Sequence, residues 1–159
     1  MAYKFAKMNQ QEAENIAYNW HYAGEYAFYD IQADEEDFNE FIDPEQRGDK
    51  IFVVMEEDEI VGFFSFNQTS PTTIDIGLGM RPNLTGNGNG LAFLEAGLAF
   101  ARSEFNPEIF TLSVATFNQR AINVYKNAGF VEIEIFMQKT NGGNYEFVKM
   151  KKKVSPYDR

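Results

Sequence analysis

The stretch that most constrains this chain is a glycine-rich loop at residues 81–90, which reads Arg-Pro-Asn-Leu-Thr-Gly-Asn-Gly-Asn-Gly. An alternating apolar run at 73–80 precedes it, and helix-forming residues at 91–105 follow it. This order predicts a strand, a glycine loop and a helix. Glycine adopts positive φ and lets a ligand approach the backbone, and the first N–H groups of a helix lack intrahelical partners. The pattern is typical of an anion site, most often for phosphate. A flexible glycine turn that only connects two elements would show the same pattern.

Length and composition set the class of protein. A chain of 159 residues is long enough for one domain with its own core. We expect a single domain over residues 1–154 and a frayed tail over 155–159. There is no cysteine and only one histidine, His21, so we expect neither a disulfide nor a metal site. No apolar run approaches the ~20 residues of a membrane helix, and the N-terminus lacks a signal-peptide pattern. We therefore expect a cytoplasmic protein that does not bind membranes.

Charge is divided unevenly along the chain. The sequence has 24 acidic and 14 basic residues, a net charge of −10, which argues against a broad nucleic-acid-binding face. Residues 1–60 hold sixteen of the acidic and four of the basic residues, leaving 24 − 16 = 8 and 14 − 4 = 10 for the rest. Two interpretations stand side by side. The acidic half is a solvated helical surface, or it attracts a cationic substrate while the other half holds an anionic cofactor.

Hydrophobic periodicity predicts the element order. We expect strands at 3–8, 51–55, 60–68, 73–80, 109–115, 130–139 and 145–152, and helices at 10–21, 33–42, 91–105 and 119–127. The segment 22–30 is an irregular aromatic link, and 45–50 is a polar turn. Asn9 with Glu12 forms a capping box, and Gly129 stands just past the end of a helix. A mixed sheet with helices on both faces accommodates this order.

Two motifs give the chain a family resemblance. Pro82 to Gly90 is similar to the signature Pro-x-x-[Gln/Arg]-Gly-x-Gly-x-[Gly/Ala] of the GCN5-related N-acetyltransferase (GNAT) superfamily. Asn118 to Phe130 is similar to its second signature, Asn-x-x-Ala-x-x-x-Tyr-x-x-x-Gly-Phe. The element order, with two helices between the first two strands, resembles the same family over nearly the whole chain. One position departs from the pattern, because Thr85 stands where the family usually has Gln or Arg, and Arg81 is a neighbouring basic residue.

The resemblance implies an α/β fold with a central mixed, mostly antiparallel sheet of six to seven strands and helices on both faces. It implies an enzyme that moves an acetyl group from acetyl-CoA to a primary amine. Pantetheine would lie along the strand before the loop, the strand at 109–115 would splay away from it, and the pyrophosphate would lie on the loop. The cofactor-binding residues that the resemblance implies are Leu78, Gly79, Met80, Thr85, Gly86, Asn87, Gly88, Asn89, Gly90, Asn118, Ala121 and Tyr125.

For catalysis, the resemblance assigns Tyr125 as the general acid that protonates the departing thiolate, because a phenol keeps its proton at neutral pH. Asp75 is the candidate base, on the strand that leads to the loop. Glu25, Asp30 and His21 are alternatives, as is deprotonation through water alone.

The aromatic link supplies candidate acceptor-binding residues, namely Tyr22, Glu25, Tyr26, Tyr29 and Asp30. Together they would make an aromatic, acidic cup for an amine-bearing small molecule or peptide, although core packing of the rings and solvation of the carboxylates explain the same residues. Two other functions stay open: a non-catalytic acyl-CoA-binding or regulatory module, and a scaffold or toxin-neutralising partner. A homodimer is expected because the long C-terminal strands offer pairable edges.

Overall fold

The computed structural model describes residues 3–154, and the expected tail at 155–159 lies outside them. The strands are β1 (Lys4–Lys7), β2 (Ile51–Glu56), β3 (Glu59–Ser70), β4 (Thr73–Met80), β5 (Ile109–Ala115), β6 (Val131–Thr140) and β7 (Gly143–Lys153). The α-helices are α1 (Gln10–Asn19), α2 (Glu35–Ile42), α3 (Pro44–Arg47), α4 (Gly90–Phe105) and α5 (Gln119–Asn127). Three 3₁₀ turns are η1 (Gly24–Tyr29), η2 (Ile31–Ala33) and η3 (Pro82–Leu84).

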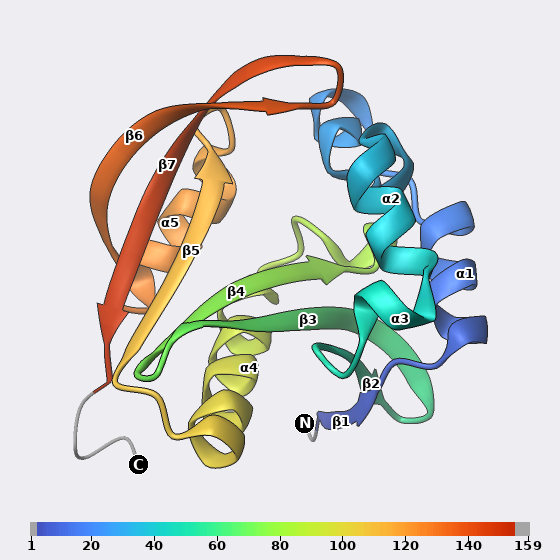
Figure 1. Ribbon diagram of the computed structural model, residues 1–159, viewed down its shortest axis with the longest axis horizontal. Helices are drawn as coiled ribbons and strands as arrows, with labels where there is room; N and C mark the ends of the chain where they lie inside the picture. Colours follow the sequence, from blue (N-terminus) through green and yellow to red (C-terminus); the bar gives the residue numbers. More distant parts are fainter. Residues whose placement is uncertain (1–2, 155–159) are drawn as a thin grey trace.

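The strands form one seven-stranded sheet in the order β1-β2-β3-β4-β5-β7-β6. The pair β4 and β5 is parallel and the other pairs are antiparallel, which confirms the expected mixed sheet of six to seven strands. β4 and β5 are paired only from Thr73 to Asp75 and from Ile109 to Thr111. Beyond these residues the two strands diverge, as Figure 1 shows for the light green and orange strands.

Helices cover both faces of the sheet, as the sequence predicts. On one face, α4 and α5 pack over the sheet in a core that includes Phe64, Phe93, Leu98 and Ile122. On the other face, α1 and α2 pack over β2 and β3 in a second cluster around Ile16, Trp20 and Val53. In Figure 1, α4 and α5 lie behind the strands, and α1 to α3 gather at the right. No helix in the described part of the chain is long and apolar enough to cross a membrane.

Helix ends follow their local sequences. The Asn9 side chain accepts from the Glu12 backbone N–H, and the Glu12 carboxylate accepts from that of Asn9. This is the expected capping box. Two local predictions were wrong: Pro44–Arg47 forms a helical turn that overlaps the polar turn expected at 45–50, and the link expected to be irregular contains the 3₁₀ turn η1. The Asp43 side chain accepts from the Glu45 backbone, and proline at the first helical position has a suitable φ.

Two close approaches explain glycines near the site. The ring of Phe64 lies against Gly97 of α4, where any Cβ would collide with it. On β4, a Cβ at Gly79 would lie 2.6 Å from the Phe63 ring. Glycine therefore lets α4 approach the sheet and lets Phe63 lie across β4. Gly77, two residues earlier on β4, also faces a side chain of β3.

Candidate active site

The opening between β4 and β5 leaves part of β4 without a neighbour. The Arg81 N–H donates to Val61, which fixes the direction in which the backbone groups of this antiparallel pair alternate. By this alternation, the N–H and C=O groups of Leu78 and Met80 point away from β3, toward the opening. An extended ligand added there would have strand-like backbone partners. The Tyr22 hydroxyl donates to the Met80 carbonyl at 2.7 Å, so the aromatic link reaches this edge.

The glycine loop forms a cradle between β4 and α4. Gly86 and Gly88 have φ of +76° and +80°, which favour glycine. Asn89 precedes α4, and its side chain makes no capping hydrogen bond to the helix. The first N–H groups of α4 are therefore left without a side-chain cap, beside exposed glycines. This arrangement of exposed amides fits a pyrophosphate.

The Thr85 side chain does not extend into this cradle as the Gln or Arg of the family pattern would. Its hydroxyl donates to the carbonyl of Pro82 at 2.8 Å, closing the η3 turn. Thr85 is thus a local structural residue, and the longer Gln or Arg side chain of the family pattern is missing from this position.

Helix α5 lies beside the loop and brings the second motif to the opening. A Cβ at Gly90 would lie 3.3 Å from Val124, so the start of α4 touches α5. Asn118 is buried, and its side chain caps α5 by accepting from the Ala121 N–H at 3.1 Å. Burial raises the pKa of the Tyr125 phenol far above its usual value, with a smaller contribution from Tyr29. Part of the Tyr125 residue is exposed, but its hydroxyl is held protonated at physiological pH.

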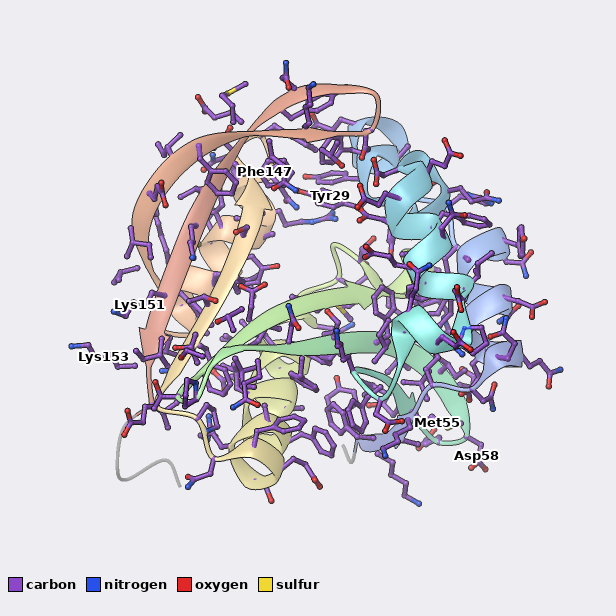
Figure 2. All side chains as sticks on the ribbon, viewed as in Figure 1. Tyr29, Met55, Asp58, Phe147, Lys151 and Lys153 are labelled. Atoms are coloured by element: carbon purple, nitrogen blue, oxygen red, sulfur yellow. The ribbon has the colours of Figure 1, made fainter. Side chains whose placement is uncertain are left out.

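Tyr29 enters the same region from η1. Its hydroxyl is buried and, among the described residues, makes no hydrogen bond of good geometry. The side chain of Asn118 and the backbone of Ala115 lie beside it and lower its pKa, but burial has the larger effect and raises it. Figure 2 shows Tyr29 and Phe147 near each other, where the N-terminal segment meets β7. An unpaired buried hydroxyl is unusual in a folded protein and calls for a partner.

Asp75 lies elsewhere. Its neighbours Ile74 and Ile76 point into the core under α4, so Asp75 faces the opposite side of the sheet. It accepts from the Thr111 hydroxyl at 2.6 Å and lines a hollow of about 680 Å³. Burial raises the pKa of the Asp75 carboxyl, while Thr111 and Lys149 act against the rise. Thr111, the partner of Asp75, is four residues or ~13 Å along β5 from Ala115. Ala115 lies beside Tyr29, which in turn is near Tyr125. Asp75 and Tyr125 are therefore not brought together.

Of the two carboxylates in the aromatic link, the Asp30 carboxylate interacts with neighbouring residues of the N-terminal segment. One oxygen of Asp30 lies 3.0 Å from His21 Nδ1, and the other accepts from the Tyr22 N–H at 2.8 Å. His21 Nε2 lies 2.9 Å from the Tyr18 carbonyl, so both ring nitrogens are engaged. The bond to Asp30 is the main reason that the pKa of His21 is raised. Glu25 is exposed.

Tyr26 contacts Arg120, a residue to which the sequence assigned no role. Its ring lies under the Arg120 guanidinium, with 4.3 Å between Arg120 Cζ and the ring centroid. Arg120 occupies a variable position of the second motif, next to the capping Asn118. The available signal was its place in the first turn of α5, but only the fold brings that turn beside the glycine loop.

Comparisons with known proteins agree with this geometry. Residues 14–130 match the family model described as "Acetyltransferase (GNAT) family". No curated protein matches the sequence.

Similar solved structures cover almost the whole chain. The spermidine N-acetyltransferase of Vibrio cholerae in complex with CoA and spermine has a TM-score of 0.75 at 17% identity, covering 99% of this chain and 98% of that one. A GNAT-family acetyltransferase from Bacillus anthracis has a TM-score of 0.72 at 16% identity, covering 95% and 94%. The N-acetyltransferase PseH of Campylobacter jejuni with acetyl coenzyme A has a TM-score of 0.66 at 20% identity, covering 97% and 100%.

Proposed function

Because this chain belongs to the acetyltransferase (GNAT) family and is an acetyl-CoA-dependent N-acetyltransferase, we propose that it acetylates a primary amine with Tyr125 as general acid. One observation carries the assignment of Tyr125. Its phenol lies near Tyr29 on the helix that adjoins the glycine loop, and burial raises its pKa. A phenol in this state keeps its proton at neutral pH and so has a proton to donate to the departing sulfur.

The cosubstrate-binding residues follow from the opening and the cradle. Leu78 and Met80 would pair with the amides of pantetheine, with Gly79 between them. The loop from Thr85 to Gly90, including Asn87 and Asn89, would hold the pyrophosphate through backbone N–H groups. Asn118 and Ala121 would lie along the other side, at the start of α5. The open edge of β4 and the two positive-φ glycines support this placement.

Acetyl-CoA supplies an acetyl group as a thioester when it is bound. A neutral amine nitrogen forms a bond to the acetyl carbon while the carbon–sulfur bond breaks. Tyr125 donates its proton to the sulfur, and the surplus proton of the amine leaves through water. A backbone N–H of β4 within Leu78–Met80 would stabilise negative charge on the acetyl oxygen.

Asp75 is the candidate base, and it would act at a distance. Burial raises the pKa of its carboxyl, which makes it a better proton acceptor. Since it lies on the opposite face from α5, a chain of water molecules would have to link it to the amine.

For the acceptor, we propose an amine-bearing cationic small molecule or peptide. Tyr22 and Tyr29 reach the opening from the link, and Tyr26, Glu25 and Asp30 stand around them. The half of the chain that carries this link is strongly acidic, which would attract cations. The Vibrio cholerae neighbour was solved with spermine, and polyamines are therefore the first acceptors to test. We place the activity in the cytoplasm, in a single domain over residues 1–154.

The replacement Tyr125→Phe tests the role of the acid. We expect kcat to fall by about 100-fold, while the Kd for acetyl-CoA, measured by calorimetry, changes by less than about three-fold, because the ring still packs in place. Turnover of the variant at the wild-type rate would remove Tyr125 as the acid. Tight acetyl-CoA binding by the wild type without transfer to any of a panel of amines would favour the non-catalytic acyl-CoA-binding module.

A further inference from the structure

Arg120 covers the glycine loop. A Cβ built on Gly86 would lie 2.9 Å from Arg120 Nη1. The guanidinium thus lies directly against the backbone of the cradle, in space that any side chain at position 86 would occupy. Gly86 is therefore glycine for two reasons, since its φ of +76° also excludes most side chains. By contrast, a Cβ at Gly88 would meet nothing within 4 Å.

The donors of this guanidinium are not committed to the protein. No ion pair of the described residues involves Arg120, and its guanidinium stacks on the face of Tyr26. A ring under one face of a guanidinium leaves the N–H groups at its edge free. Those N–H groups form a planar fork that suits phosphate oxygens.

The other basic residue near the loop is engaged elsewhere. Arg81 Nε donates to Asn83 at 2.8 Å, and Nη1 lies 3.5 Å from Glu59 and 3.4 Å from the Ile60 carbonyl. Arg81 thus ties the end of β4 to the β2–β3 hairpin. Thr85, which takes the place of the usual Gln or Arg, is bonded to Pro82. Neither residue supplies a cation to the cradle.

We propose that Arg120 is the phosphate-binding cation of this acetyltransferase, reaching the cradle from α5 in place of the side chain missing at Thr85. The inference rests on the proposed binding of acetyl-CoA at the glycine loop. Its chemical target is the diphosphate of the cosubstrate. Tyr26 acts as a positioning residue, because its ring holds the guanidinium plane over Gly86.

This arrangement couples the acceptor-side link to the cosubstrate. Tyr26 belongs to η1, the segment that also carries Tyr29, and its ring lies 6.2 Å from Phe117. A diphosphate bound by Arg120 would therefore be linked through Tyr26 to η1.

Binding measurements with and without the phosphates test the role of Arg120. For Arg120→Gln, we expect acetyl-CoA affinity to fall by about ten- to one-hundred-fold, with a weaker dependence on salt. Acetyl-pantetheine, which lacks the phosphates, should bind both proteins equally. Arg81→Gln is the matched control, since it removes the same charge near the loop and should change acetyl-CoA affinity by less than about three-fold. Equal acetyl-CoA affinity of the wild type and Arg120→Gln would overturn the proposal.

The two loop glycines give an independent comparison. Gly86→Ala and Gly88→Ala introduce the same kind of backbone strain, but only the first pushes Arg120 away. We expect Gly86→Ala to weaken acetyl-CoA binding at least five-fold more than Gly88→Ala. This difference should vanish when each change is made separately in the Arg120→Gln protein. A difference that persists in that background would show that Arg120 is not responsible.

Tyr26 variants separate positioning from simple packing. Tyr26→Leu removes the ring face and should weaken acetyl-CoA binding by about two- to five-fold, without affecting acetyl-pantetheine. Tyr26→Phe keeps the face and should bind as the wild type does. Failure of the two proposals is distinguishable: if the wild type binds no acetyl-CoA, the proposed function fails, whereas wild-type binding without an Arg120 effect defeats this inference alone.

Discussion

The hydroxyl of Tyr29 is buried without a well-formed hydrogen bond among the described residues, although Asn118 and Tyr125 are close to it. A buried hydroxyl of this kind costs stability, so its presence points to a partner that arrives with substrate. For Tyr29→Phe, we expect an unchanged or higher free energy of unfolding in urea, together with a fall in kcat of about ten-fold.

Tyr145→Phe is the control for this prediction. Tyr145 belongs to the same aromatic cluster, with its ring 4.9 Å from Phe28, but it is 39% exposed. Both its stability and its turnover should match the wild type. If Tyr29→Phe lowers stability and leaves kcat intact, the hydroxyl is structural.

At the scale of elements, Asp34 joins the acidic segment to the β6–β7 turn. Its carboxylate caps α2 by accepting from the Asp37 N–H at 3.0 Å, and it also accepts from the Asn141 N–H at 2.9 Å. These bonds, the one to Asp37 first, lower the pKa of Asp34 below its ordinary value of 3.8. A carboxyl with a depressed pKa stabilises the fold above its unfolded pKa, and this contribution is lost as pH falls through the folded pKa.

We therefore expect Asp34→Ala to lower the free energy of unfolding by about 1–2 kcal/mol at pH 7, measured by urea denaturation. The deficit should shrink as pH falls below 3.8 and through the lower folded pKa, where the wild-type carboxyl becomes protonated. Asp34→Asn keeps an oxygen acceptor without the charge, and its stability should lie between the two. A deficit that stays constant down to pH 2 would mean that the charge contributes nothing.

Elements with a strong local signal were predictable from the sequence. The capping box at Asn9 depends on residues three positions apart, and periodicity placed all seven strands. The helical turn at Pro44 was missed because Asp43-Pro44 is also typical of the end of a helix. Arg120 over Gly86 could not be predicted, since the contact joins residues far apart in sequence and depends on how α5 packs against α4.

At the scale of the whole molecule, the sheet ends in two unlike edges. β1 has four residues, whereas β6 has ten and carries four exposed apolar side chains. Val131, Ile133, Ile135 and Met137 are between 49% and 62% exposed. A long apolar edge strand is a template for pairing unless a partner covers it. We expect a second copy to pair with β6 in antiparallel fashion, giving the homodimer suggested by the sequence.

Oppositely charged side chains would face each other across this dimer interface. In the antiparallel register that overlaps all of β6, Val131 lies opposite Thr140 of the second copy and Glu132 lies opposite Lys139. Light scattering during size exclusion should therefore show a dimer for the wild type and a monomer for Ile135→Lys, since a buried lysine at the interface is costly.

Glu132→Lys should also weaken the dimer, by placing like charges opposite each other, whereas the double change with Lys139→Glu should restore it. Glu132 also pairs with Lys126 of its own chain at 2.9 Å, so the restored dimer, more than the single disruption, is what identifies this register. A wild type that stays monomeric at high concentration would show that the β6 edge is not a self-association surface.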